Sequence, residues 1–281
     1  MLSSSTDRAA RLLFGVATGG VVLLALVVAA AGSVGIIGGS EPAFTSAHWL
    51  AILSTPTLWL SLAYSALIAM ASLLPSVLLA LLIVLAAGER LRRAPLGALL
   101  YLPLAFPGVV AALVAVQVLG GAGWLSRIAH TAGVLAAPEE FPALVQDRIG
   151  VGIVITHMLM VTPFFVLLID RLSTLERLDA LAALGRSLGA TSAQVLWSIR
   201  LPILLRGLTP VCTVYGAALL ASFEVPLLIG AQHPAMIAVE IDRHLHPLDL
   251  STQGEGYAMA CVHVMLLTGI WWRMSRPAAR R

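Results

Sequence analysis

The chain has 281 residues, of which 59% are hydrophobic and 11% charged, with a formal net charge of +3 at pH 7. Its mean hydropathy of +0.95 lies far outside the range of soluble globular domains, so the composition predicts an integral membrane protein. The chain contains no lysine. This excludes a P-loop lysine, a Schiff base and the lysine of a penicillin-binding-type site, so we do not expect the chain to hydrolyse nucleotides by itself.

Six apolar runs are near or above the length of a membrane-spanning helix, which is about 20 residues. They are Leu12–Ile37, Trp59–Ala87, Leu99–Gly120, Val151–Ile169, Leu208–Leu228 and Tyr257–Trp272, the last being the shortest. We therefore expect an all-α membrane protein in which residues 1–281 form one transmembrane domain. The first run resembles a signal peptide, with basic residues before it and AAAGS within it. It is longer than the apolar region of about 7–15 residues in such peptides, so we expect it to be retained.

Arginine predicts the orientation, because the cytoplasmic loops of membrane proteins carry an excess of basic residues. With the N-terminus inside, 14 of the 17 arginines fall on the inner side. The exceptions are Arg127, Arg148 and Arg243. Six spans then place both termini in the cytoplasm, and residues 170–206 form the longest inner loop. The outer segment 38–58 is expected to hold a short interfacial helix around Trp49, Leu50 and Leu53.

The inner loop is predicted to be two helices joined by a glycine turn. The sequence STLE at 173–176 is a capping-box pattern, so a helix is expected to begin there. An apolar stripe follows at helical spacing: Leu175, Leu178, Leu181, Ala182, Gly185 and Leu188. Gly189 lies where a left-handed residue would end this helix, and TSAQ at 191–194 is a second capping-box pattern. The second helix is expected to run to about Arg200, before Pro202 interrupts it.

This arrangement is also found in proteins that bind DNA, but the setting argues against nucleic acid. The loop is joined to membrane spans at both ends, and its second helix, QVLWSIRLPILL, is too apolar for a major groove. A surface that docks onto another protein at the membrane is the better interpretation.

The loop resembles the signature of type I ATP-binding-cassette (ABC) importer permeases, in which E-A-A-x-x-x-G is followed by nine residues and I-x-L-P. Gly189 is followed here by nine residues and then by Ile199, Leu201 and Pro202. The resemblance covers most of the chain from about residue 43. The segment SFEVPLLIG at 222–230 is similar to the branch of these permeases that transports polyamines, iron and thiamine.

The resemblance implies a non-catalytic subunit that forms a translocation path in a bacterial inner membrane. A coupling helix, about 175–188, would lie in a cleft of a cytoplasmic ATPase. The residues expected to couple to the ATPase are Leu181, Ala182, Gly185, Arg186, Leu188, Gly189, Ala190, Ile199, Leu201 and Pro202. The implied partners are two ATPase subunits, a second permease chain and a periplasmic binding protein. No cofactor is expected on this chain, because ATP and magnesium would bind to the ATPase.

One position departs from the family pattern, because Ala183 replaces the glutamate of the E-A-A motif. In the family this glutamate helps to attach the loop to a basic residue of the ATPase. Two alternatives remain open: Arg186 makes a contact of the opposite sign, or a sister permease carries the intact motif. Substrate identity and pairing with the same or another permease are likewise open.

Polar residues inside the predicted spans are candidates for the path. Glu224 is the only acid within a span, and burying an ionised group in a bilayer costs about 2–3 kcal/mol or more. Glu224, Ser222, Tyr215 and His157 are the candidate path residues, with a capping carboxylate and a core histidine as competing interpretations. Neither His157 nor His263 has metal-ligand spacing, so no metal site is expected. Cys212 and Cys261 fall in opposite halves of the membrane and are expected to be free thiols.

Two other classes of membrane protein compete with the permease. A self-sufficient carrier or channel would place paired ionisable groups near the midplane, and one glutamate near an edge does not fit this. A membrane enzyme would need converging catalytic groups, which the spacing of the polar residues does not provide.

Overall fold

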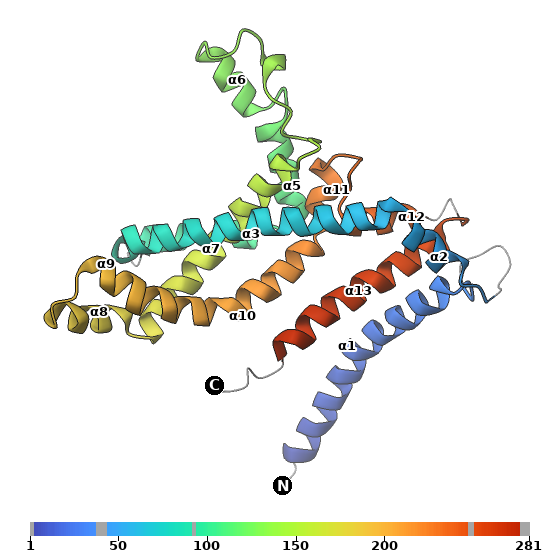
Figure 1. Ribbon diagram of the computed structural model, residues 1–281, viewed down its shortest axis with the longest axis horizontal. Helices are drawn as coiled ribbons and strands as arrows, with labels where there is room; N and C mark the ends of the chain where they lie inside the picture. The colour runs from blue at the N-terminus through green and yellow to red at the C-terminus, as the bar shows by residue number, and fades with distance from the viewer. Residues whose placement is uncertain (1–2, 38–43, 92–93, 247–249, 276–281) are drawn as a thin grey trace. The chain divides into compact units, whose positions relative to one another are not determined.

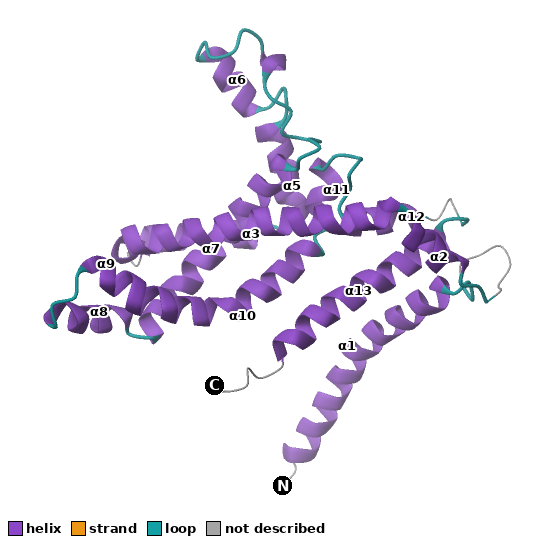
Figure 2. Cartoon of the chain, viewed as in Figure 1, coloured by secondary structure: helices purple, strands orange, loops and turns teal. Residues whose placement is uncertain are grey.

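The computed structural model describes residues 3–37, 44–91, 94–246 and 250–275, and every regular element in these ranges is helical (Figure 1, Figure 2). The arginines at 92, 93, 276, 280 and 281, which contribute to the predicted orientation, lie outside the described residues. Contacts between residues gather in two compact units. One unit takes in residues 1–61 and 237–269, and the other takes in 62–236 and 270–281.

The first unit packs around the end of its first helix. It contains α1 (Ser3–Ser33), α2 (Ala47–Ser54), α12 (Ile237–His244) and most of α13 (Gln253–Ser275). The indole of Trp49 donates a hydrogen bond to Ser33 Oγ (3.3 Å). Gly32 lies against the ring of Tyr257, so closely that a Cβ at residue 32 would overlap the ring. These contacts join α1 to α2 and α13, and α2 confirms the short helix predicted around Trp49.

The second unit holds the remaining helices. They are most of α3 (Pro56–Leu91), α4 (Ala94–Leu99), η1 (Pro103–Ala105), α5 (Gly108–Leu119), α6 (Trp124–Thr131), η2 (Pro138–Glu140), α7 (Val151–Leu175), α8 (Leu178–Ser187), α9 (Ser192–Val195), η3 (Leu196–Arg200), α10 (Leu201–Leu220) and α11 (Glu224–Ile229). Prolines 75, 163 and 210 lie inside α3, α7 and α10, and these helices continue through them.

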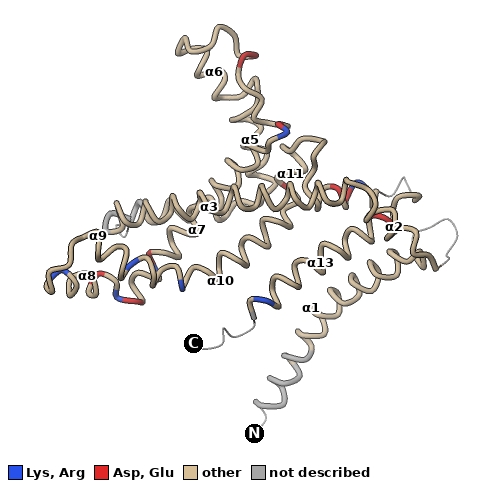
Figure 3. The backbone as a smooth tube through the Cα atoms, in the orientation of Figure 1, with Lys and Arg blue, Asp and Glu red and all other residues tan. Residues whose placement is uncertain are grey.

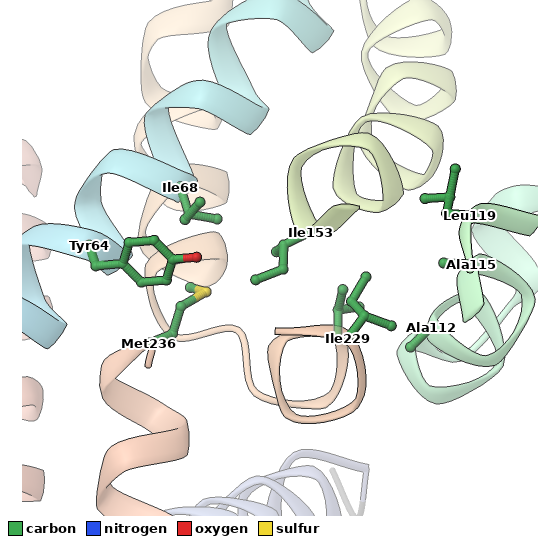
Figure 4. Packing of buried hydrophobic residues seen from close by; sticks show 9 residues of the cluster. Tyr64, Ile68, Ala112, Ala115, Leu119, Ile153, Ile229 and Met236 are labelled. Carbon is green, nitrogen blue, oxygen red and sulfur yellow. The ribbon is translucent and has the colours of Figure 1, made fainter. Parts of the chain in front are cut away.

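The core of the second unit joins four helices that are far apart in the chain. Side chains of α3, α5, α7 and α11 meet there (Figure 4). The buried members are Tyr64, Ile68, Ala112, Ala115, Leu119, Ile153, Val225, Ile229 and Met236. The start of α7 is held beside this core by Asp147, whose carboxylate accepts hydrogen bonds from the amides of Val151 (2.7 Å) and Gly152 (3.3 Å). The carboxylate thereby satisfies two of the free amides at a helix N-terminus.

Five described helical segments are long and apolar enough to cross a membrane. They are Leu13–Ser33, Pro56–Gly88, Gly108–Thr131, Val151–Leu175 and Ser192–Leu220. The first, second and fourth agree with predicted spans, although the first ends at Ser33 and the fourth extends to Leu175. The predicted sixth span is helical, as α13, but it is not among the five. The number of spans and the side on which each terminus lies therefore stay predictions.

The predicted third and fifth spans have the wrong boundaries. Residues 100–107 separate α4 from α5 and contain Pro103 and Pro107, so the membrane-length segment begins at Gly108 and includes α6. The fifth run is broken after Leu220, and Glu224 begins a separate short helix, α11. Proline has no amide hydrogen to donate, so it favours the start of a helix and disfavours its continuation.

Two local predictions in the inner loop are also wrong. Ser173 does not begin a helix, because α7 continues to Leu175 and the Ser173 hydroxyl donates to the carbonyl of Ile169 (2.7 Å). The break comes at Arg177, which has a left-handed backbone (φ 50°), and α8 begins at Leu178. Pro202 does not interrupt the second helix, because the π-helical turn η3 leads directly into α10. A changed hydrogen-bond register before a proline reduces the conflict between its ring and the preceding turn.

Candidate functional site

The glycine turn within residues 170–206 has the predicted geometry. Gly189 has φ +89°, its amide donates to the carbonyl of Arg186 (3.0 Å), and the amide of Ala190 donates to the carbonyl of Gly185 (3.0 Å). This pair of bonds is a Schellman motif, which ends a helix with a left-handed residue. The predicted second capping box is present as well, since Thr191 and Gln194 exchange side-chain and backbone hydrogen bonds. The turn therefore ends α8, and the capping box satisfies the amides of Thr191 and Gln194 at the start of α9.

The apolar residues of α8 occupy two faces and do not form the one stripe that was predicted. Leu178 and Ala182 are buried, and Gly185 lies against Ile199 and Val195, where a Cβ would be 3.1 Å from Ile199 Cδ1. The outer face presents Leu181, Leu184 and Leu188, with Leu188 80% exposed. Leu175 is exposed on α7. One face of α8 thus packs on α7, α9 and η3, while the other is uncovered in the described chain.

An ion pair that spacing did not predict ties α8 to η3. Asp179 Oδ1 lies 2.9 Å from Nη2 of Arg200, with the aspartate side chain 67% exposed. An exposed pair of this kind contributes about 0–1 kcal/mol. It connects α8 to η3, which continues through Leu201 and Pro202 into α10. The end of α7 and α8 carry charged residues of both signs (Figure 3).

The four candidate path residues lie together in a second place. His157, Tyr215, Ser222 and Glu224 all line one cavity of about 290 Å³ between α7, α10 and α11. Tyr215 also packs on Phe164 and Phe165, with ring centroids 5.0 Å and 5.5 Å away. Residues that are up to 67 positions apart in the sequence therefore share one site, from His157 to Glu224.

A chain of hydrogen bonds crosses this region. Nε2 of His157 lies 3.0 Å from Ser222 Oγ, and its Nδ1 lies 3.3 Å from Ser72 Oγ. Through these two bonds the buried imidazole bridges α3 to the break between α10 and α11. His157 therefore has the hydrogen bonds expected of a core histidine, and it also lines the cavity that is the candidate path.

Glu224 lies at the N-terminus of α5. Its carboxylate rests against Gly108, the first residue of α5, where the missing Cβ leaves room for Oε2. A carboxylate at this end of a helix is stabilised by the partial positive charge of the helix dipole. The glutamate is exposed, and it both borders the cavity and lies at the start of α5.

Several contributors were missed by sequence reasoning. Gly108, Ser72 and the Asp179–Arg200 pair had no signal, because their partners lie far away in the sequence. The predicted stripe also omitted Leu184, which is 58% exposed on the uncovered face of α8. A helical wheel showing all the apolar residues of α8 would have revealed a second apolar side that includes it. Both cysteines are free thiols. Among the described residues, no group of three or more His, Cys, Asp or Glu is placed to hold a metal ion.

Comparison with known proteins identifies the fold. No protein-family model matches the chain, and no curated protein matches it in sequence. Solved structures, in contrast, match the chain in fold. A chain of a bacterial ABC transporter involved in the import of the acidic polysaccharide alginate superposes with a TM-score of 0.68 and 15% identity, over 99% of this chain and 96% of that one. A chain of the bacterial alginate ABC transporter in complex with a periplasmic protein bound to alginate pentasaccharide gives 0.66 and 16%, over 97% and 96%.

Proposed function

We propose that this chain is the transmembrane permease subunit of a bacterial ABC importer, of the type I class. One observation carries the proposal. A chain with the fold of alginate ABC transporter chains has, after the C-terminal end of α7, a two-helix loop with the glycine turn and I-x-L-P spacing of these permeases.

The loop is suited to transmit movement. Its outer face exposes leucines at positions 181, 184 and 188, an apolar surface that favours a protein partner over water. Its inner face is packed on α7 and η3, and η3 continues into α10 without a break. A displacement of α8 by a partner would therefore pass to α10 and α7 as rigid helices, which is the usual basis of such transitions. The partner we infer is a pair of cytoplasmic ATPases that bind ATP and magnesium.

The cavity bordered by Glu224 is our candidate for part of the translocation path. It is reached by α7, α10 and α11, so movement of the loop would change its shape. We infer that a second permease chain completes the path, and that a periplasmic binding protein delivers the substrate. The chain would lie in the inner membrane with both termini in the cytoplasm.

For the substrate, we propose a small polar solute. The cavity of about 290 Å³ is at the lower end of small-molecule sites, which span about 300–1,000 Å³. The one carboxylate favours a cation, and SFEVPLLIG at 222–230 is the basis for the polyamine, iron and thiamine branch. The solved structures give this branch no support, because the transporters they describe import an acidic polysaccharide.

Co-purification tests the proposal against a self-sufficient carrier. The tagged chain would be extracted from its own host in mild detergent, and proteins that accompany it identified by mass spectrometry. We expect an ATPase with a Walker A lysine, a second permease chain or excess of this one, and a binding protein. Reproducible recovery of the folded chain alone would contradict the proposal and favour the carrier.

A further inference from the structure

The uncovered part of α8 combines an apolar side with unbalanced charge. Leu184 and Leu188 are exposed on its apolar side, and Ala183 and Arg186 are exposed on the side away from these leucines, because residues two positions apart do not share a face of a helix. Residues three positions apart on a helix lie on adjacent turns of one side, so Ala183 and Arg186 face the same region of any partner. The family glutamate would stand at residue 183, and an arginine stands one turn further along in this chain.

Carboxylates near this face do not offset the arginine. Asp179, the one acid of α8, is held by Arg200 within the loop, 2.9 Å away. Arg177 and Arg186 are exposed at the two ends of α8, and the structure gives neither an ion pair within the described residues. Glu176 is exposed at the end of α7, so the two arginines leave an excess of positive charge. The uncovered part of α8 is therefore apolar on one side and cationic on the other.

We propose that the partner is an ATPase subunit whose docking cleft is apolar and carries carboxylates opposite Arg186, so that the charge polarity of this contact is reversed relative to the family pattern. The inference rests on the proposed function, because it takes α8 to be the helix that docks. A cleft with a basic residue at this place would repel Arg186 and would find no acid at residue 183. Electrostatic complementarity of this kind chooses between partners more than it adds affinity.

Five variants test the polarity, with binding measured by biolayer interferometry. The full-length chain would be placed in lipid nanodiscs, and the probe is the ATPase subunit recovered by co-purification. The variants are Arg186→Glu, Ala183→Glu, the double variant Ala183→Glu/Arg186→Ala, Leu184→Asp and Arg148→Glu. Arg148→Glu is the matched control, because it makes the same charge change at an exposed position before the other end of α7. All the altered side chains are exposed, so folding should be retained.

We expect Arg186→Glu to weaken ATPase binding about tenfold or more at an ionic strength of about 50 mM, and less at about 500 mM, because salt screens exposed charges. Ala183→Glu should also weaken binding, since the new carboxylate would repel the cleft and neutralise Arg186. The double variant should bind more weakly than the wild type as well. Arg148→Glu should bind like the wild type.

The outcomes separate the two proposals. If the double variant binds more tightly than the wild type, or Arg186→Glu behaves as Arg148→Glu does, the reversed polarity is wrong. If Leu184→Asp nevertheless weakens binding in that case, the docking surface and the proposed function stand. If the wild-type chain binds no ATPase, the proposed function fails and the polarity fails with it.

Discussion

The backbone at Gly189 offers the sharpest test of the coupling loop. Its φ of +89° is disfavoured for every residue with a side chain, yet a Cβ at this position would meet no atom within 4 Å. The cost of Gly189→Ala is therefore conformational alone, about 1–2 kcal/mol for an L-residue in the left-handed region. Valine should cost more because its side chain branches at Cβ, and asparagine less because it tolerates this region.

A cost of this size changes the population of the native turn by a factor of about 5–30. If the residue leaves the left-handed region, the bonds from Gly189 to Arg186 and from Ala190 to Gly185 are both lost. The second helix then starts in a different direction, although the spans still insert. We expect ATPase binding and transport-coupled ATP hydrolysis to fall in the order glycine, asparagine, alanine, valine.

Gly133 supplies the control for this series. It follows α6 with φ +72°, a Cβ there would likewise meet no atom within 4 Å, and it closes the same hydrogen-bond motif, with Val134 donating to Ala129 (2.9 Å). Gly133→Val should lower the thermal midpoint as Gly189→Val does but leave ATPase binding unchanged. Wild-type coupling in Gly189→Val, or equal loss of coupling in Gly133→Val, would refute the reasoning.

Three further predictions concern the path, the core and the topology. Gly108→Ala should lower the thermal unfolding midpoint, because the new Cβ displaces the Glu224 carboxylate, and this effect should be lost in a Glu224→Ala background. A thermal double-mutant cycle should give a coupling free energy of about 0.5–1.5 kcal/mol. Additive effects of the two substitutions would contradict the contact. Tyr64→Phe should leave the midpoint unchanged or raise it, because the buried hydroxyl has no hydrogen-bond partner in the described chain; a clear loss would reveal one. In a chain without Cys212 and Cys261, Arg148→Cys should react with an impermeant maleimide on intact spheroplasts and Arg186→Cys only after lysis; the reverse would overturn the orientation.

Interactions between near neighbours were predictable. The left-handed Gly189 and the Thr191–Gln194 capping box depend on hydrogen bonds between residues at most five positions apart, so their residue pattern was sufficient. The capping-box pattern at Ser173 failed because α7 continues through it, packed by its buried residues up to Ile169. A local signal can therefore be overridden when tertiary contacts favour a longer helix.

Composition was enough to establish that the chain is helical and apolar enough to span a membrane, because each span requires about 20 apolar residues in a row. Helix packing, in contrast, set which side of α8 is covered, since the leucines at 178 and 184 look alike until α7 and η3 bury one of them. Packing also placed His157 between Ser72 and Ser222, and Glu224 over Gly108. These contacts join residues 65 to 116 positions apart, and no spacing rule specifies them, because they depend on how whole helices lie against one another.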